Sequence, residues 1–294
     1  MIEIGNLGIE PGVYPGDVPG DQVKGCQDLN LAKPFDRAAL AIRLTLLVMA
    51  ATTIYALLTM DYQGINVYQA ILDTLSNLKT IFFQPYSSHF TVWQAFCEVV
   101  ITLGLAFLTT LFGGVIALFL GLMAAQNLSP KWLTNVIKSF VAFIRAVPTI
   151  LWVLIFAVAA GLGSTAAVIG LTFHSVAYLT KAYSESFEDL DRSVIEALAA
   201  TGANWWQIVF QAVIPSSATY LLSWTFLRFE INFGNAVAMG AAAGAAGIGF
   251  DLFMASGFYF NLHEVGLITY FILAFAILLE TLATNIKGRL LKQD

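Results

Sequence analysis

Charged residues are scarce in this chain. Lys, Arg, Asp and Glu make up 11% of its 294 residues, whereas hydrophobic residues make up 58%. An ordinary soluble domain is about 25% charged, so the composition excludes that class. Several apolar stretches reach the roughly 20 residues that a helix needs to cross a bilayer, and none alternates like a barrel strand. The sequence therefore predicts an all-α polytopic membrane protein.

The chain also lacks the residues that metal, redox or nucleotide chemistry needs. Its two cysteines, Cys26 and Cys97, have no metal or redox spacing, and its three histidines form no HExxH motif. There is no GxxxxGK[ST] loop and no Gly-Lys dipeptide. The glycines of GAAAGAAGIG (residues 240–249) favour close helix packing, or a bend in an outer loop, over a nucleotide loop. We therefore expect no catalytic residues, no metal and no cofactor in this chain.

Six membrane spans can be placed along the sequence. They lie at about residues 41–59, 96–123, 140–160, 166–183, 215–236 and 265–282. Between the first two, VYQAILDTLSNLKTIFF has apolar residues near helical spacing, which predicts a helix lying at the membrane interface. Pro215 is expected to start the fifth span, where its missing N–H costs nothing.

Lysine and arginine are distributed unevenly between the two sides of these spans. Twelve of the 14 fall in the N-terminal segment, around the loops after spans two and four, or in the tail. Lys79 alone lies on the other side, and Arg228 lies inside the fifth span. The positive-inside rule then places both termini in the cytoplasm. The predicted parts are a polar, mobile cytoplasmic segment (1–35), a first span with an extracytoplasmic loop (36–95), a core (96–286) and a cytoplasmic tail (287–294).

The loop after the fourth span contains the segment EALAATGANWWQIVFQAVIP. Ser193 and Glu196 have the spacing of a helix capping box, and Asn204 and Gln207 repeat that spacing. Gly202 stands between them as a helix stop that tolerates a left-handed backbone. The segment is thus predicted to form a helix, a glycine turn and a second helix. Composition leaves open whether its alanine-rich face docks another protein or packs against its own bundle.

This segment resembles the EAA loop of ABC importer permeases, which reads Glu-Ala-Ala, three residues, Gly, nine residues, Ile-x-Leu-Pro. The matching positions are Glu196, Ala197, Gly202 and Pro215, with apolar replacements at Leu198, Ala212 and Ile214. In that family the loop forms a coupling helix that docks in a cleft of a cytoplasmic ATPase. The resemblance implies a coupling loop at residues 184–214 with the contact residues Glu196, Ala197, Ala200, Gly202, Ala203 and Trp205.

Two further stretches are similar to the phosphonate-type permeases of that family. They are RFEINFGNAVAMGAAAGAAGIGFDLF and RAVPTILWVLIF, although Gly234 stands where arginine is common. Members of the group import phosphonates, and relatives import phosphite or phosphate. The resemblance implies a type I ABC importer fold with about six transmembrane helices, working as a homodimer in the lipid of the bacterial inner membrane. It also implies a separate ATPase dimer that binds ATP and Mg, an extracytoplasmic binding protein, and no nucleic-acid partner.

Charge inside the fifth span is evidence independent of that resemblance. Arg228 lies 13 residues after Pro215, which is about 20 Å along a helix and therefore deep in the bilayer. Glu230 projects about 200° away around the same helix, so the two residues cannot pair with each other. With Asn232 and Arg145, they form the predicted translocation pathway. The alternative is that partners on other spans satisfy Arg228 and Glu230, and that Arg145 is a cytoplasmic anchor.

Other transport classes stay open at this stage. The chain could be an ABC permease for another small solute, such as an amino acid. An ion-coupled secondary transporter would need mid-membrane acids or broken helices in symmetric halves, and only Glu230 comes near that pattern. His174 in the fourth span is expected to be a hydrogen-bonded packing residue rather than a proton carrier.

Overall fold

The computed structural model describes residues 37–60, 64 and 66–290. The predicted mobile segment at 1–35, with Cys26, and the end of the tail lie outside the described residues. The chain divides into two compact units, residues 1–65 and 66–294. The first unit contains α1 (Arg37–Thr59), whose 23 residues confirm the first predicted helix. At a rise of 1.5 Å per residue, α1 is about 35 Å long, which suffices for a bilayer core of about 30 Å.

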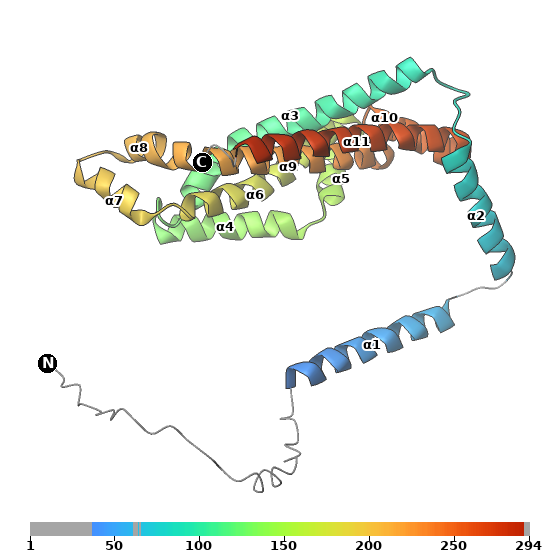
Figure 1. The fold of residues 1–294 in the computed structure, drawn as a ribbon, viewed down its shortest axis with the longest axis horizontal. Coiled ribbons are helices and arrows are strands. Elements are labelled where there is room, and N and C mark those ends of the chain that lie inside the picture. Colours follow the sequence, from blue (N-terminus) through green and yellow to red (C-terminus); the bar gives the residue numbers. More distant parts are fainter. Residues whose placement is uncertain (1–36, 61–63, 65, 291–294) are drawn as a thin grey trace, which may run out of the picture. The chain divides into compact units, whose positions relative to one another are not determined.

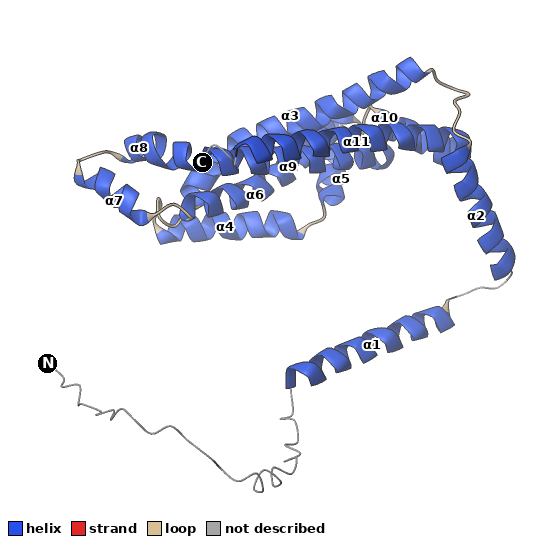
Figure 2. Ribbon diagram, in the orientation of Figure 1, coloured by secondary structure: helices blue, strands red, loops and turns tan. Residues whose placement is uncertain are grey.

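The second unit consists of helices and turns, without a strand among its described residues (Figure 2). Its helices are α2 (Val67–Phe83), α3 (Val92–Ala124), α4 (Lys131–Ala146), α5 (Thr149–Ala160), α6 (Ser164–Glu188), α7 (Arg192–Ala200), α8 (Trp205–Ile208), α9 (Ile214–Ala243), α10 (Ile248–Phe253) and α11 (Leu262–Leu290). Two π-helical turns follow α8 and α10, at Val209–Val213 and Met254–Phe258. Helix α2 has the bounds of the predicted interfacial segment, so its helical state is confirmed.

Three helices form the centre of this unit. Helices α3, α6 and α9 pack on one another, α4 and α5 pack on α6, and α10 and α11 pack on α9 (Figure 1). Small residues bring α3 and α6 together, because a Cβ atom added at Gly113 would lie only 2.7 Å from the Cβ atom of Ser175. Figure 1 also shows α7 and α8 at one end of the bundle and α10 toward the other.

Among the described residues, three helices are long and apolar enough to cross a membrane, and the number rises to five when each of two bent helix pairs is one span. Helix α6 has 25 residues, but serine, threonine and charged residues are distributed along it. Because α3, α4, α5 and α9 surround it, α6 does not need an apolar surface toward lipid. When α6 is counted as a span in addition to these five, the total agrees with the six spans predicted from the sequence.

The third predicted span, at residues 140–160, is not one continuous helix. Helices α4 and α5 meet at an angle of 91°, and the break lies at Val147 and Pro148. Proline has no N–H for the helix ladder, and it also disfavours the helical conformation in the residue before it. The apolar run therefore continues through a position at which the backbone turns by a right angle.

The glycine-rich stretch after the fifth span combines close packing with a bend. A Cβ atom added at Gly240 would lie 2.4 Å from the backbone nitrogen of Phe250, so the two helices touch through their backbones. Gly244 ends α9 in the left-handed conformation, at φ 66°. The bend between the helical segments Trp205–Ala243 and Ile248–Phe258 is 51°. Close packing at Gly240 and a bend at Gly244 are thus both confirmed, whereas the placement of the bend on the outer side stays a prediction.

Candidate functional site

The first helix of the predicted coupling segment is capped by a residue other than the one expected. Asp191 is the N-cap of α7, and its Oδ1 atom accepts a hydrogen bond of 2.9 Å from the backbone N–H of Ser193. The predicted capping box of Ser193 and Glu196 is therefore wrong. Helix α7 begins at Arg192, because a carboxylate at the positive end of a helix is a strong capping group. Hydrogen bonds from the backbone and side chain of Ser193 hold the pKa of Asp191 below its ordinary value of 3.8.

The turn after α7 has the predicted geometry. Gly202 adopts φ +85°, in the left-handed region. The backbone N–H of Gly202 donates to the carbonyl of Ala199 at 3.0 Å, and that of Ala203 donates to Leu198 at 3.3 Å. These two bonds make a Schellman motif, which satisfies the last carbonyl groups of α7. The glycine stop is confirmed.

The second capping box is also confirmed. The Oδ1 atom of Asn204 accepts from the backbone N–H of Gln207 at 3.0 Å, and Oε1 of Gln207 accepts from the N–H of Asn204 at 2.7 Å. Trp205, the first residue of α8, is half-buried, and its indole N–H donates to the carbonyl of Leu128 at 3.0 Å. The indole therefore fixes the start of α8 to the loop that follows α3.

The predicted coupling residues divide between the surface and the bundle. Three side chains of α7, Glu196, Ala197 and Ala200, are exposed, as is Gly202, whereas Ala203 and Trp205 are half-buried. The carboxylate of Glu196 has no hydrogen bond within the described part of the chain. One half of the segment thus packs against its own bundle, and the other half offers a face of small side chains to solution.

Pro215 lies in the first turn of α9, which begins at Ile214, so the predicted start of the fifth span is confirmed. No break separates α9 from α8, however. Helix α8 passes through the π turn Val209–Val213 directly into α9, so the helical path from Trp205 to Ala243 is unbroken. In the π turn the N–H of Ile214 bonds to the carbonyl of Val209, five residues back. A proline inside a helix lacks a donor and crowds the carbonyl four residues earlier, and the wider π turn accommodates both effects. The second helix of the coupling segment and α9 are one rod.

The polar centre of the bundle is built around Arg228 on α9. This side chain is 2% exposed. Its Nε atom donates to Oγ of Ser175 at 3.0 Å, and a terminal guanidinium nitrogen donates to Nδ1 of His174 at 3.0 Å. Its Cζ atom also lies 5.0 Å from the centre of the Tyr178 ring. Partners on another span therefore hold Arg228, as the structural alternative predicts, and His174 is the hydrogen-bonded packing residue that we expected.

Asn232 extends this network to a third helix. It is fully buried, and its Nδ2 atom donates to Oγ1 of Thr110 on α3 and to Oγ of Ser175 on α6, both at 2.9 Å. Thr110, Asn232, Ser175 and Arg228 thus connect α3, α6 and α9 through side chains. Sequence reasoning did not identify Ser175, Thr110 or Tyr178. The available signal was a hydroxyl or phenol in an apolar span that could oppose a buried arginine.

The other two predicted pathway residues lie on different sides of α9. Arg145, at the exposed end of α4, has its Cζ atom 5.9 Å from the centre of the same Tyr178 ring. Glu230 instead lines a cavity of about 450 Å³ between α9 and α11, together with Trp224. The structure brings Arg145 and Arg228 to one aromatic ring and leaves Glu230 apart. The expectation that Arg228 and Glu230 do not pair is confirmed.

Within the described ranges no group of three His, Cys, Asp or Glu could hold a metal ion.

The sequence matches the family described as "Binding-protein-dependent transport system inner membrane component" over residues 117–293. It is similar to the phosphite transport system permease protein PtxC of Stutzerimonas stutzeri, with 30% identity over 226 residues, or 76% of this chain and 82% of that protein. It is also similar to the phosphate-import permease protein PhnE of Mycolicibacterium smegmatis, with 29% identity over 194 residues. That match covers 64% of this chain but only 35% of the larger relative.

A solved structure supports the fold. The inward-facing MetNI methionine ABC transporter has a chain that aligns with a TM-score of 0.63 and 21% identity, covering 69% of this chain and 99% of that one. At that identity the likeness speaks for the fold alone, which is that of a type I ABC importer permease. With the family match spanning more than half of its length, this chain belongs to the binding-protein-dependent transport system inner membrane components.

Proposed function

We propose that this permease carries a phosphonate-type or related oxyanion, such as phosphite or phosphate, across the cytoplasmic membrane. The named relatives are permeases for phosphite and phosphate, and Arg228 offers a cation to an anionic cargo. No carboxylate within the described residues forms an ion pair with this buried guanidinium. A buried cation without a counter-ion is costly, so an anion that reaches it is attracted. This uncompensated charge is the observation that carries the proposal.

The transmembrane movement would be driven from α7. We infer that its exposed face, with Glu196, Ala197 and Ala200, docks in a cleft of a separate ATPase dimer, which binds ATP and Mg. Because Trp205 begins a helical rod that also carries Arg228, a displacement of α8 reaches the polar centre without an intervening loop. Rigid elements of this kind can convert closure of an ATPase pair into alternating access.

The remaining partners follow from the same proposal. Both termini and α7 face the cytoplasm, and an extracytoplasmic binding protein delivers the cargo to the opposite end of the bundle. A second copy of this chain completes the pathway, and lipid surrounds the pair. The chain itself hydrolyses nothing.

Calorimetry on the cognate binding protein tests the cargo. The protein is titrated with methylphosphonate, phosphite and phosphate, and with methionine as the amino-acid control. Saturable binding of one or more oxyanions, without methionine binding, is the expected result. Binding of methionine alone would reject the oxyanion in favour of the amino-acid alternative. Transport by this chain without any ATPase would instead reject the ATP-driven mechanism in favour of an ion-coupled carrier.

A further inference from the structure

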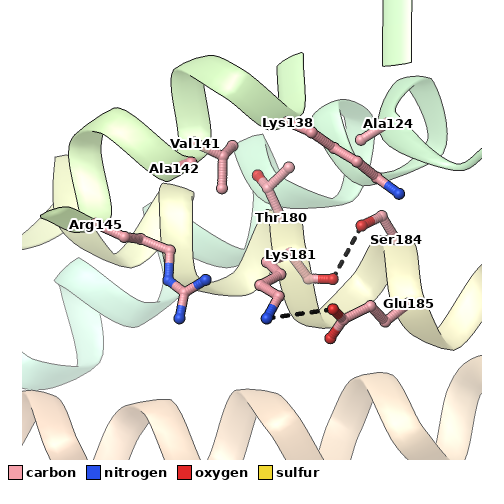
Figure 3. A pocket seen from close by; sticks show the side chains of 9 residues that line it. All are labelled: Ala124, Lys138, Val141, Ala142, Arg145, Thr180, Lys181, Ser184 and Glu185. Carbon is pink, nitrogen blue, oxygen red and sulfur yellow. Dashed lines mark hydrogen bonds and ion pairs between the residues drawn. The ribbon is translucent and has the colours of Figure 1, made fainter. Parts of the chain in front are cut away.

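A second polar site lies between α4 and α6, toward the end of the bundle where α7 is. It is a cavity of about 310 Å³ (Figure 3). Its polar lining consists of Lys138, Arg145, Thr180, Lys181, Ser184 and Glu185, and the rest of the wall is alanine and valine. The cavity is thus mainly cationic, with apolar walls that exclude some of the surrounding water.

The positive charge of this cavity is only partly neutralised. Lys181 pairs with Glu185 at 3.3 Å, and Lys138 pairs with Glu188 at 2.8 Å. Both pairs are partly exposed, so they hold their lysines weakly. Arg145 has no ion pair among the described residues. In Figure 3 the Arg145 guanidinium and the Lys181 ammonium lie on the same side of the cavity. Each lysine keeps N–H donors in excess of its one acceptor.

Thr180 provides an independent sign of a ligand. Its side chain is 1% exposed and lines the cavity, yet its Oγ1 atom has no hydrogen-bond partner. Buried hydroxyl groups are normally paired, and Thr110 and Thr225 bond to carbonyls of their own helices. Thr180 makes no such bond. Its hydroxyl therefore remains available as a neutral donor in a cavity that Arg145 and Lys181 also line, a combination suited to an oxyanion.

Polar side chains on one face of α6 extend from the polar centre toward the cavity. His174, Tyr178, Lys181 and Glu185 recur at intervals of three and four residues, so they form a single stripe. Tyr178 marks the junction, because Arg228 and Arg145 both approach its ring, at 5.0 Å and 5.9 Å. Cationic groups thus follow one another from the buried guanidinium to the cavity.

We propose that the α4–α6 cavity is a binding site for a small tetrahedral oxyanion, which the cargo occupies after it leaves Arg228 on its way to the cytoplasm. Arg145 and Lys181 supply the charged donors, and Thr180 supplies the neutral donor. The inference rests on the proposed function, because it takes the cargo to be an oxyanion. The phosphate group of an anionic lipid shares this chemistry, so the experiment separates the two sources.

Phosphate binding to the purified full-length permease in maltoside micelles tests the site, with inorganic phosphate as the probe and chloride as the control anion. We expect saturable phosphate binding that Arg145→Gln weakens about tenfold or more, since a charged contact is lost. Thr180→Val should weaken it about fivefold, and it removes no bond from the folded chain. The matched controls are Lys131→Gln, an exposed cation of α4, and Thr134→Val, whose buried hydroxyl also lacks a partner but does not line the cavity.

Three results would overturn the inference. Wild-type permease that binds no phosphate is one, and equal phosphate affinity in Thr180→Val, Arg145→Gln and the two controls is another. The third is displacement of phosphate by phosphatidylglycerol in nanodiscs, which would assign the cavity to a lipid headgroup. Failure here is distinguishable from failure of the proposed function, because calorimetry on the binding protein reports the cargo without this chain.

Discussion

Replacing Arg228 by methionine separates a role in transport from a role in stability. Methionine fills a similar long, unbranched volume but brings no charge and no N–H donor. The substitution removes the hydrogen bonds to Ser175 and His174 and the contact with the Tyr178 ring. Ser175 keeps Asn232 as its partner, so α3, α6 and α9 stay joined in the variant.

The free-energy terms at Arg228 nearly cancel. Two hydrogen bonds from a charged donor contribute about 3–6 kcal/mol, and the cation–π contact adds up to about 2 kcal/mol. Burial of the ion, here 2% exposed, costs several kcal/mol in return. We therefore expect Arg228→Met to change the free energy of unfolding by no more than about 2 kcal/mol. Oxyanion uptake should fall about ten- to hundredfold, because a charged contact with the cargo is lost.

The assay pairs thermal unfolding in detergent with uptake by proteoliposomes. Lys131→Met is the matched control, since it removes an exposed cation of α4 that lies outside both polar sites. Uptake that stays at the wild-type rate in Arg228→Met would refute the role of this charge. A loss of several kcal/mol in the free energy of unfolding would show that the favourable and unfavourable terms at Arg228 do not cancel. Arg228 would then be chiefly a structural residue.

Three further predictions concern the coupling segment. A side chain at position 202 would meet no atom within 4 Å, but the backbone at φ +85° would strain it by about 1–2 kcal/mol. Gly202→Val should therefore raise the amount of ATP hydrolysed per oxyanion imported, whereas Gly202→Asn, which tolerates this conformation, should not. Equal ratios in the two variants would refute the turn's role. Trp205→Phe removes one partly buried hydrogen bond, about 1 kcal/mol of local stability, and should speed hydrogen exchange at residues 205–213. Trp206→Phe, at an exposed indole, should have no such effect. Asp191→Ala should speed exchange throughout α7 at neutral pH and Asp191→Asn should not. Because bonds from Ser193 depress the pKa of Asp191, the cap's contribution should be constant from about pH 8 to 5 and be lost only as pH falls below 3.8 through the folded pKa; a loss already at pH 6 would contradict this.

Local features of the coupling segment were predictable because they depend on neighbouring residues. Gly202 and the pair Asn204 and Gln207 act through backbone groups within three or four positions, so their pattern specifies the turn. The first cap was assigned wrongly for the same kind of reason. Asp191 and Ser193 lie two residues apart, and each can cap a helix. The sequence pattern alone does not decide which amide the side chain reaches.

Features that depend on distant residues could not be read from the pattern. Hydropathy is continuous through Val147 and Pro148, and a proline in a span can produce a mild kink as well as a right angle. The angle of 91° depends on how α4 and α5 pack against α6. Likewise, an arginine inside a span predicts that it has polar partners. It does not identify them, because Ser175 is 53 positions away from Arg228 and only the packing of α6 against α9 brings the two together.

Uptake into proteoliposomes shows whether this permease carries an oxyanion at the expense of ATP. The permease is reconstituted with its ATPase and binding protein, and labelled phosphate, methylphosphonate and methionine are supplied with ATP or without it. We predict saturable uptake of an oxyanion that requires ATP, needs the binding protein and excludes methionine. Uptake of methionine in place of the oxyanions, or oxyanion uptake that proceeds without ATP, would contradict it.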